Sequence, residues 1–268
     1  MSTFRVQEPS RARVPILLSV PHCGTAFPDE LADDYVGALS RDPDDTDYFV
    51  DRLYDFASEL GITTIAAIYS RWVIDLNRDP SDKPLYADGR IITGLCPVTT
   101  FLGEALYKDG RLEVTGAEIA RRVEQYYRPY HDKLRELLES LRNEFGRVLL
   151  WDCHSIRQRV RTVYPEEIPD LILGDNEGKS CDDQLAKVAL DGLKQGAYDV
   201  RYNQPFKGGY ITRYFGKPVD DIHALQLEMT KCRYMDDDEK RYDQARANKM
   251  RVVLKNTLNR LSEALRLA

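Results

Sequence analysis

Short runs of apolar, often β-branched residues are spaced along this chain between segments with a helical pattern. The clearest runs are residues 147–151 (RVLLW), residues 14–20 (VPILLSV), which end before Pro21, and residues 62–69 (ITTIAAIY). Near-continuous apolar runs of this length are typical of strands that are buried on both faces of a sheet. Three weaker strand candidates are residues 72–76, 171–173 and 224–227. The runs therefore predict a sheet that is covered on both sides.

The segments between these runs carry apolar residues at helical spacing. A helix over residues 46–60 would place its apolar side chains on one face and end at Gly61. The longest helix is expected over residues 117–145, where Thr115 and Glu118 have the spacing of a capping box. Two further helices are expected over residues 184–194 and 239–267. The last of these should pack along one face of the sheet.

Strands that alternate with helices predict an α/β fold, with a mostly parallel or mixed central sheet and helices on both faces. The sequence has 268 residues and contains no internal repeat or linker, so residues 1–268 are expected to form a single domain. Residues 79–110 are rich in Pro, Gly, Asp and Thr. They predict a long structured loop region, and such loops often carry function.

Composition restricts the partners and the compartment. The formal net charge is −6, with Lys and Arg interleaved with acids, which disfavours nucleic acid as a partner but allows a small anionic substrate. The five cysteines are widely spaced and include no C-x-x-C pair, as expected in a reducing compartment. No stretch has the apolar length of a membrane span or a signal peptide. We therefore expect a cytoplasmic protein; the sequence carries no signal for oligomeric state.

Polar residues that can perform chemistry stand at the predicted carboxyl ends of strands, where ligands bind in open α/β sheets. His22 follows the first run, Asp152 and His154 follow the strongest run, and Glu228 follows the last one. Two imidazoles and one carboxylate, with a fourth position for water, are the usual ligands of a catalytic zinc ion. A further carboxylate would then serve as the general base.

The acidic ligand is less well defined by the residues themselves. Asp47, at the start of the predicted helix 46–60, is one candidate. Asp44, Asp45 and Asp47 could instead only cap that helix and complement its dipole. Asp152 could also be the ligand, or it could orient one of the histidines from outside the metal's coordination shell.

Basic residues cluster near the breaks between elements. Arginine binds carboxylates in a bidentate manner, and a glycine pair at 208–209 would let backbone approach a ligand closely. Together these residues predict a pocket for a small substrate with two carboxylates. The candidate binding residues are Arg71, Asn77, Arg78, Lys207 and Arg213. Of the remaining histidines, His131 within a helix is expected to have a surface or packing role, and His223 before the last strand a structural one.

Nine segments in order resemble the N-formylglutamate amidohydrolase family, between about Val14 and Met235. The segments are SVPHCG, DTDYFVDRLYDFASELG, YSRWVIDLNR, DKPLY, TGLCP, LLWDCHSIR, LGDNEGKSCD, FKGGYITRYFG and IHALQLEM. The resemblance implies hydrolysis of N-formyl-L-glutamate to formate and L-glutamate, at the last step of one histidine-degradation route. It also implies the fold of zinc-dependent exopeptidases (phosphorylase/hydrolase-like) and one divalent ion, zinc, which other divalent metals could replace in vitro.

By position, the resemblance makes His22 and His154 metal ligands and Glu228 the base. Carboxypeptidases of this larger group have a glutamate three residues after the first histidine, but that position is Thr25 here. The acidic ligand must then come from elsewhere, and Asp47, in the family's T-D segment, is our choice. The arginines would bind the two glutamate carboxylates, with Asn77 and Lys207 in support.

Three other interpretations remain open at this stage. The first is a metal-dependent hydrolase of another N-acyl amino acid or of a small peptide, which would differ only around the acyl group. The second is a non-catalytic ligand-binding protein on the same fold. The third is nucleophilic catalysis by Cys23 or Cys153, each of which adjoins a histidine. Neighbouring residues of a strand point to opposite faces, which disfavours such cysteine–histidine pairs.

Overall fold

The apolar runs form the centre of a seven-stranded sheet in the computed structural model, which describes residues 2–81, 83, 93–109 and 114–267. The strands are β1 (Phe4–Gln7), β2 (Ile16–Val20), β3 (Thr63–Ala67), β4 (Val148–Ile156), β5 (Leu171–Gly174), β6 (Val200–Tyr202) and β7 (Ile222–Thr230). Their order across the sheet is β1-β3-β2-β4-β7-β5-β6. The four central strands β3, β2, β4 and β7 are parallel. At the edges, β1 runs antiparallel to β3, and the parallel pair β5 and β6 runs antiparallel to β7. The predicted mixed, mostly parallel sheet is therefore confirmed.

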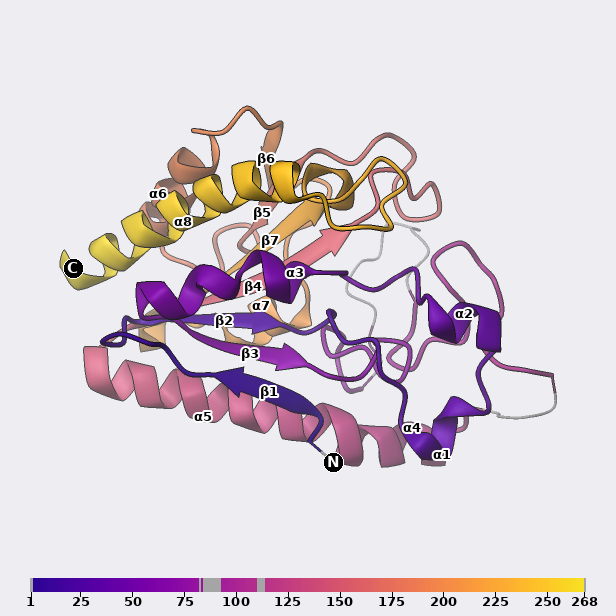
Figure 1. Ribbon diagram of the computed structural model, residues 1–268. Coiled ribbons are helices and arrows are strands. Elements are labelled where there is room, and N and C mark those ends of the chain that lie inside the picture. The colour runs from indigo at the N-terminus through magenta and orange to yellow at the C-terminus, as the bar shows by residue number, and fades with distance from the viewer. Residues whose placement is uncertain (1, 82, 84–92, 110–113, 268) are drawn as a thin grey trace.

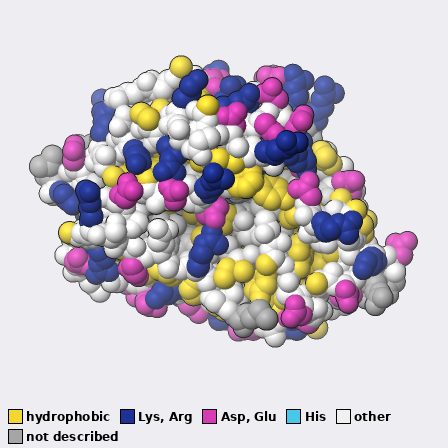
Figure 2. Space-filling model, viewed as in Figure 1, with side chains coloured by type: hydrophobic (Ala, Val, Ile, Leu, Met, Phe, Trp, Pro, Cys, Tyr) yellow, Lys and Arg dark blue, Asp and Glu magenta, His cyan; other side chains and the backbone are white. Residues whose placement is uncertain are grey.

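Helices cover both faces of this sheet (Figure 1). They are α1 (Asp29–Ala32), α2 (Gly37–Arg41), α3 (Val50–Leu53), α4 (Gly116–Arg122), α5 (Arg128–Phe145), α6 (Asp183–Leu193), α7 (Tyr210–Phe215) and α8 (Gln244–Leu267). The predicted α/β fold with two helical layers is therefore confirmed. Figure 2 shows acidic and basic side chains interspersed over one face of the molecule.

Two apolar cores lie on opposite faces of the sheet because strand side chains alternate. Trp151 and Leu225 pack on the side of α3, α6 and α8. Leu17, Leu150 and Ala224 pack on the side of α5 and α7. Burying a leucine side chain such as those of Leu17, Leu150 and Leu225 contributes about 1.5–3 kcal/mol. The alternation also directs the polar residues of these strands to a chosen face.

The expected helix over residues 46–60 is wrong as a single element. Phe49 has a positive φ of 62°, a left-handed conformation that interrupts a helix, so α3 begins only at Val50. A 3-10 turn, Asp55–Leu60, follows it and ends at Gly61, which has a φ of 83°. Val50, Leu53, Tyr54 and Ala57 are nevertheless buried, because short irregular turns can bury the same face.

The weak strand candidate at residues 72–76 is also wrong, because this segment forms turns beyond the end of β3. Its side chains are buried in the core beneath α5, which explains the apolar pattern without a strand. The backbone amide of Asp75 donates to the carbonyl of Leu95 (2.8 Å) instead of to a sheet neighbour. Burial alone therefore misled the interpretation of this run.

The long helix at residues 117–145 is confirmed as α4 and α5 joined by a π-helical turn, Val123–Tyr127, which ends two residues before Pro129. A proline has no backbone N–H to donate to the preceding helical turn. This missing hydrogen bond explains the wider turn before it. Thr115 caps α4 by accepting from the amide of Glu118, as predicted.

The predicted loop region 79–110 forms only isolated bridges where the structure describes it; residues 82, 84–92 and 110 lie outside the described residues. Within the described ranges, every helix is too short or too polar to cross a membrane.

Candidate metal centre

The central strands bring the predicted site residues together at one end of the sheet. His22 lies two residues beyond β2, whereas Asp152, His154 and Glu228 lie inside β4 and β7 rather than after them. Their predicted position after the strands is corrected because both strands continue to Ile156 and Thr230. His154 and Glu228 are direct partners in the parallel ladder between β4 and β7.

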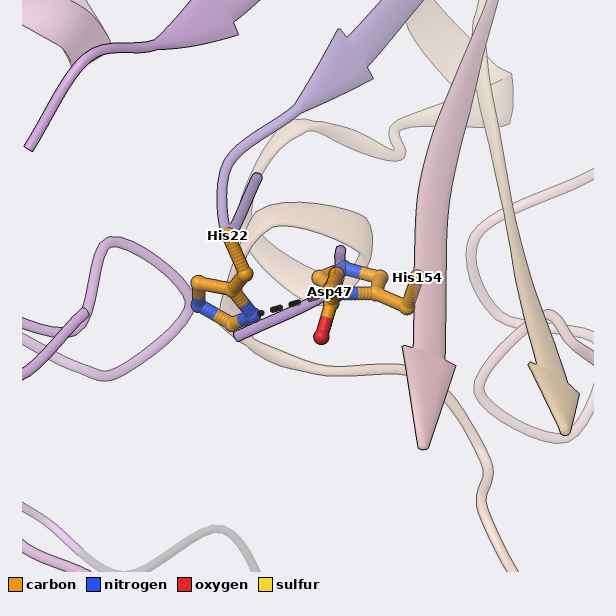
Figure 3. A group of neighbouring side chains, drawn as sticks. All are labelled: His22, Asp47 and His154. Atoms are coloured by element: carbon orange, nitrogen blue, oxygen red, sulfur yellow. Dashed lines mark hydrogen bonds and ion pairs between the residues drawn. The ribbon is translucent and has the colours of Figure 1, made fainter. Parts of the chain in front are cut away.

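Asp47 lies between the two histidines (Figure 3). Its turn is held against the end of β2 because the Asp47 amide donates to the His22 carbonyl (2.9 Å). Asp47 Oδ2 lies 3.1 Å from His154 Nδ1 and 3.7 Å from His22 Nδ1. One ligand atom from each of the three residues fits within 4.8 Å of the others, and all three residues are buried. Two imidazole nitrogens and a carboxylate oxygen therefore converge on one point.

The opposite nitrogen of each imidazole is held by a second carboxylate. His22 Nε2 lies 2.8 Å from Asp75 Oδ1, and His154 Nε2 lies 2.8 Å from Asp152 Oδ2. A proton on each Nε2 would satisfy these carboxylates and leave the Nδ1 lone pairs facing the shared point. Metal-binding histidines commonly donate their other N–H to a carboxylate, which fixes the tautomer and raises the basicity of the ligand.

The residues at this point fit a divalent cation. Among the described residues, His22 Nδ1 has no hydrogen-bond partner although it is buried. A buried polar atom without a partner is costly, and coordination of a cation would satisfy it. Burial disfavours ionisation of Asp47, but the facing imidazoles outweigh burial and hold its pKa below the usual value. A charged carboxylate thus remains available as a ligand.

The surroundings of His154 carry an excess of negative charge, which shifts its pKa. Burial disfavours the charged imidazole, but the carboxylates of Asp152 and Asp47 outweigh burial and raise its pKa well above 6.5. Three acids, Asp47, Asp75 and Asp152, surround the two histidines and are almost fully buried. Buried carboxylates need compensating positive charge, which a divalent ion would supply.

Asp75 is a site residue that the sequence analysis missed. It belongs to the apolar segment WVIDL, which we interpreted as a strand. The residue is fully buried and also accepts from Arg71 Nη2 (2.6 Å). Burial opposes its ionisation, but Arg71, His22 and Arg78 keep its pKa well below the usual value. The sequence did carry a signal for Asp75: it is an acidic residue within an otherwise apolar run, two residues before Asn77.

Replacing Asp75 with Asn is expected to weaken metal binding about 10–100-fold, the usual effect of losing such an outer carboxylate. The loss of its charge would make His22 a weaker ligand and leave Arg71 without its buried carboxylate. A competition titration with a zinc chelator measures the affinity. Asp51→Asn, at a half-exposed ion pair with Arg5, is the matched control. An unchanged affinity in the Asp75 variant would remove Asp75 from the centre.

Glu228 stands beside the ligand cluster on the neighbouring strand. Burial raises its pKa to about 8, although the positive charges of His154 and Arg71 oppose this shift. A carboxyl with a pKa near neutrality can both accept and release a proton at physiological pH. This position and pKa agree with the predicted role of Glu228 as the base, which remains a prediction.

Arg71, Asn77 and Arg78 lie on the turns that follow β3. Arg71 is buried and its guanidinium stacks over the ring of Phe101 at 4.8 Å. Arg78 Nε donates to the carbonyl of Thr93 (3.1 Å) and lies 3.9 Å from Asp75. The Asn77 amide nitrogen lies 3.0 Å from His154 Nε2. Asn77 therefore lies beside His154, and Arg71 and Arg78 are linked to His22 through Asp75.

Lys207 and Arg213 belong to the segment around the glycine pair. Lys207 is partly exposed and pairs with Glu177 (2.6 Å). Arg213 Nε donates to the carbonyl of Gly208 (2.8 Å), which folds the arginine back on its own loop. Substrate binding by these residues remains a prediction.

The alternative reading of the acids near residue 46 as helix caps is wrong for α3. Its N-cap is Phe49, and in the part of the chain that the structure describes no side chain caps it. Asp45 instead accepts from the indole nitrogen of Trp72 (2.8 Å), and Asp44 pairs with Arg157.

The predicted structural histidines are both buried. His131 Nε2 lies 2.8 Å from the carbonyl of Leu76 and the ring stacks on Tyr127, so it packs α5 against the segment that carries Asn77. Burial lowers its pKa to about 4, which keeps it neutral. His223 lies inside β7 rather than before it.

Neither cysteine beside a histidine is activated. Cys153 packs in the core on the side of α8, the face opposite to that of Leu150 and Ala224. Burial raises the pKa values of both Cys23 and Cys153, which disfavours the nucleophilic thiolate. The cysteine alternative therefore lacks the required chemistry.

A mixed α/β sheet whose central strands bring two buried histidines close to a buried aspartate is an arrangement typical of metal-dependent hydrolases. The family model described as N-formylglutamate amidohydrolase matches residues 14–235. The chain belongs to this family. It is 45% identical to the N-formylglutamate deformylase of Pseudomonas putida over 254 residues, 94% of this chain and 93% of that protein.

Two further comparisons agree. The N-formylglutamate deformylase of Pseudomonas aeruginosa is 45% identical over 229 residues, 85% of this chain and 84% of that protein. The crystal structure of N-formylglutamate amidohydrolase from Ralstonia eutropha JMP134 is 30% identical with a TM-score of 0.82, and the match covers 99% of each chain. The similarity therefore extends over the whole fold.

Proposed function

We propose that this protein hydrolyses N-formyl-L-glutamate to formate and L-glutamate, as the last step of one route of histidine degradation. One zinc ion would be held by His22, Asp47 and His154. The observation that carries the proposal is the buried His22–Asp47–His154 cluster, in which each histidine has a carboxylate at its other nitrogen. Relatives that are 45% identical over most of the chain and are named N-formylglutamate deformylase support the substrate.

When bound, zinc supplies a Lewis acid for the formyl oxygen and lowers the pKa of water towards neutrality. Glu228 takes a proton from the attacking water at its carboxylate. It then passes this proton to the amide nitrogen as the C–N bond breaks, because an amide anion is a very poor leaving group. The water oxygen remains in formate, and glutamate leaves as the amine.

The two glutamate carboxylates need positive partners. Arg71, Arg78 and Arg213 are the proposed partners, with Asn77 and Lys207 in support. Arg71 and Arg78 both approach Asp75, so the same turn that orients His22 also orients these two cations. Substrate binding and metal binding would thereby share one rigid segment. The five cysteines are free thiols, which is consistent with the reducing cytoplasm as the site of the reaction.

Metal analysis combined with formate release tests the proposal. We expect about one zinc ion per chain, loss of formate release from N-formyl-L-glutamate after chelation, and recovery when zinc is restored. N-acetyl-L-glutamate is the matched comparison, because it differs only in the acyl group. Activity in metal-free protein would contradict the proposed centre. Bound zinc with turnover of the acetyl compound alone would move the substrate to another N-acyl amino acid.

A further inference from the structure

The first turn of helix α7 is capped by residues from two distant segments. Its N-cap is Gly209, and among the described residues no side chain of the helix's own N-terminus caps it. The Gly209 amide donates to Gln226 Oε1 (2.7 Å), and the Ile211 amide donates to Asn77 Oδ1 (2.8 Å). The amide of Tyr210 lies 3.3 Å from the carbonyl of Asn77. Amide groups that the helix itself leaves without partners are thus satisfied by Asn77 and Gln226.

Gln226 connects this cap to the catalytic strands. It lies on β7 two residues before Glu228, so both side chains are on the same face of the sheet. Gln226 is buried, and its Oε1 also accepts from the amide nitrogen of Asn77 (3.4 Å). That nitrogen is 3.0 Å from His154 Nε2. Gln226 therefore joins α7 to the Asn77 turn, and the Asn77 carboxamide in turn lies beside His154.

The contact between these segments is too close for another side chain. A Cβ atom at Gly209 would lie 2.2 Å from the Asn77 amide nitrogen, well inside van der Waals contact. The Asn77 carboxamide thus packs directly on the backbone of the loop. A shift of the loop would break the hydrogen bonds of both Asn77 and Gln226.

Helix α7 carries one of the proposed substrate-binding residues. Arg213 lies on α7 and donates its Nε to the carbonyl of Gly208, next to the capped residue. Lys207 precedes the same glycine pair. The position of this loop relative to β7 therefore determines where both cations stand relative to Glu228 and the histidines.

We propose that Gln226 is a positioning residue for substrate binding: its side-chain oxygen docks α7, and with it Arg213, onto the strand that carries Glu228. The expected change in KM rests on the proposed function, in which Arg213 binds a carboxylate of the substrate. The docking itself is a property of the protein without substrate.

Gln226→Met removes the acceptor while keeping the length of the side chain. We expect faster amide hydrogen exchange at residues 209–211, unchanged zinc content, and an increase of about ten-fold in KM for N-formyl-L-glutamate with little change in kcat. Gln195→Met, at an exposed position after α6, is the matched control and should change none of these. If Gln226 only contacted the substrate, its substitution would leave amide exchange at residues 209–211 unchanged in the substrate-free protein.

Gln226→Glu keeps an acceptor oxygen and should retain slow exchange at residues 209–211. If the amides of residues 209–211 exchange as fast in Gln226→Glu as in Gln226→Met, the proposal is overturned. It is also overturned if Gln226→Met has the wild-type exchange rate at these amides or the wild-type KM. If Gln226→Met does not fold, the amide exchange rates of the wild-type protein test the docking instead. Gly209 and Ile211 should exchange more slowly than the first-turn amides of α2, and equal rates would overturn the docking. Absence of formate release in the wild type would instead refute the proposed function, while the exchange results would still test the docking.

Discussion

Replacing Glu228 with Gln is expected to lower kcat for N-formyl-L-glutamate by about two to four orders of magnitude, the usual contribution of general acid–base catalysis. The amide keeps the size of the side chain but can neither take the proton of the attacking water nor return it to the leaving amine. Zinc content should remain at the wild-type level, because Glu228 is not among the three converging ligands. Steady-state formate release, measured together with metal content, checks both parts.

Glu239→Gln is the matched control for this variant. Glu239 is a buried acid that accepts from the amide of Gln158 rather than facing the histidines, and a glutamine can accept in the same way. Its kcat should stay near the wild-type value. Near-full activity in Glu228→Gln would show that another group moves the proton. Loss of zinc in that variant would show that Glu228 is a ligand.

Asp47→Asn is expected to abolish stable zinc binding and, with it, nearly all formate release. Asn keeps the shape of the side chain but loses the negative charge that faces both imidazoles, and a neutral amide oxygen is a poor zinc ligand. The loss should exceed the roughly 10–100-fold effect expected for an outer carboxylate such as Asp75. Metal content after dialysis and zinc titration followed by calorimetry measure it.

Asp44→Asn tests whether this result is specific to position 47. Asp44 lies in the same turn but pairs with Arg157, so its variant should bind zinc normally. Full zinc binding by Asp47→Asn would transfer the ligand role to another acid. Asp152 is then the first to examine, because it already contacts His154.

The strands and helices that bury one continuous apolar face could be predicted from the sequence. Strands β2, β3, β4 and β7 and helices α5, α6 and α8 were all expected near their observed positions, because periodicity directly reflects burial. The same rule explains the errors. Residues 72–76 have the apolar pattern of a strand, yet tertiary packing buries them in turns. The edge strands β1 and β6 were missed because they are short and partly exposed.

For the site, the sequence alone indicated His22, His154 and Glu228 as candidates, because residues at the ends of adjacent parallel strands meet at one edge of a sheet. The residues themselves left the acidic ligand open between Asp47 and Asp152, and the family resemblance favoured Asp47. The tertiary structure supports Asp47, because it places this residue near both Nδ1 atoms and Asp152 at the far nitrogen of His154. It also revealed Asp75 and Gln226.

Asp75 and Gln226 act through partners that are 53 and 17 residues away in the chain, His22 and Gly209. Local patterns carry the period of each element, and they determined which strands would be buried and which chemical groups would stand at their ends. The distance between two side chains on different elements depends on how the turns fold back. That information exists only once the whole chain has packed.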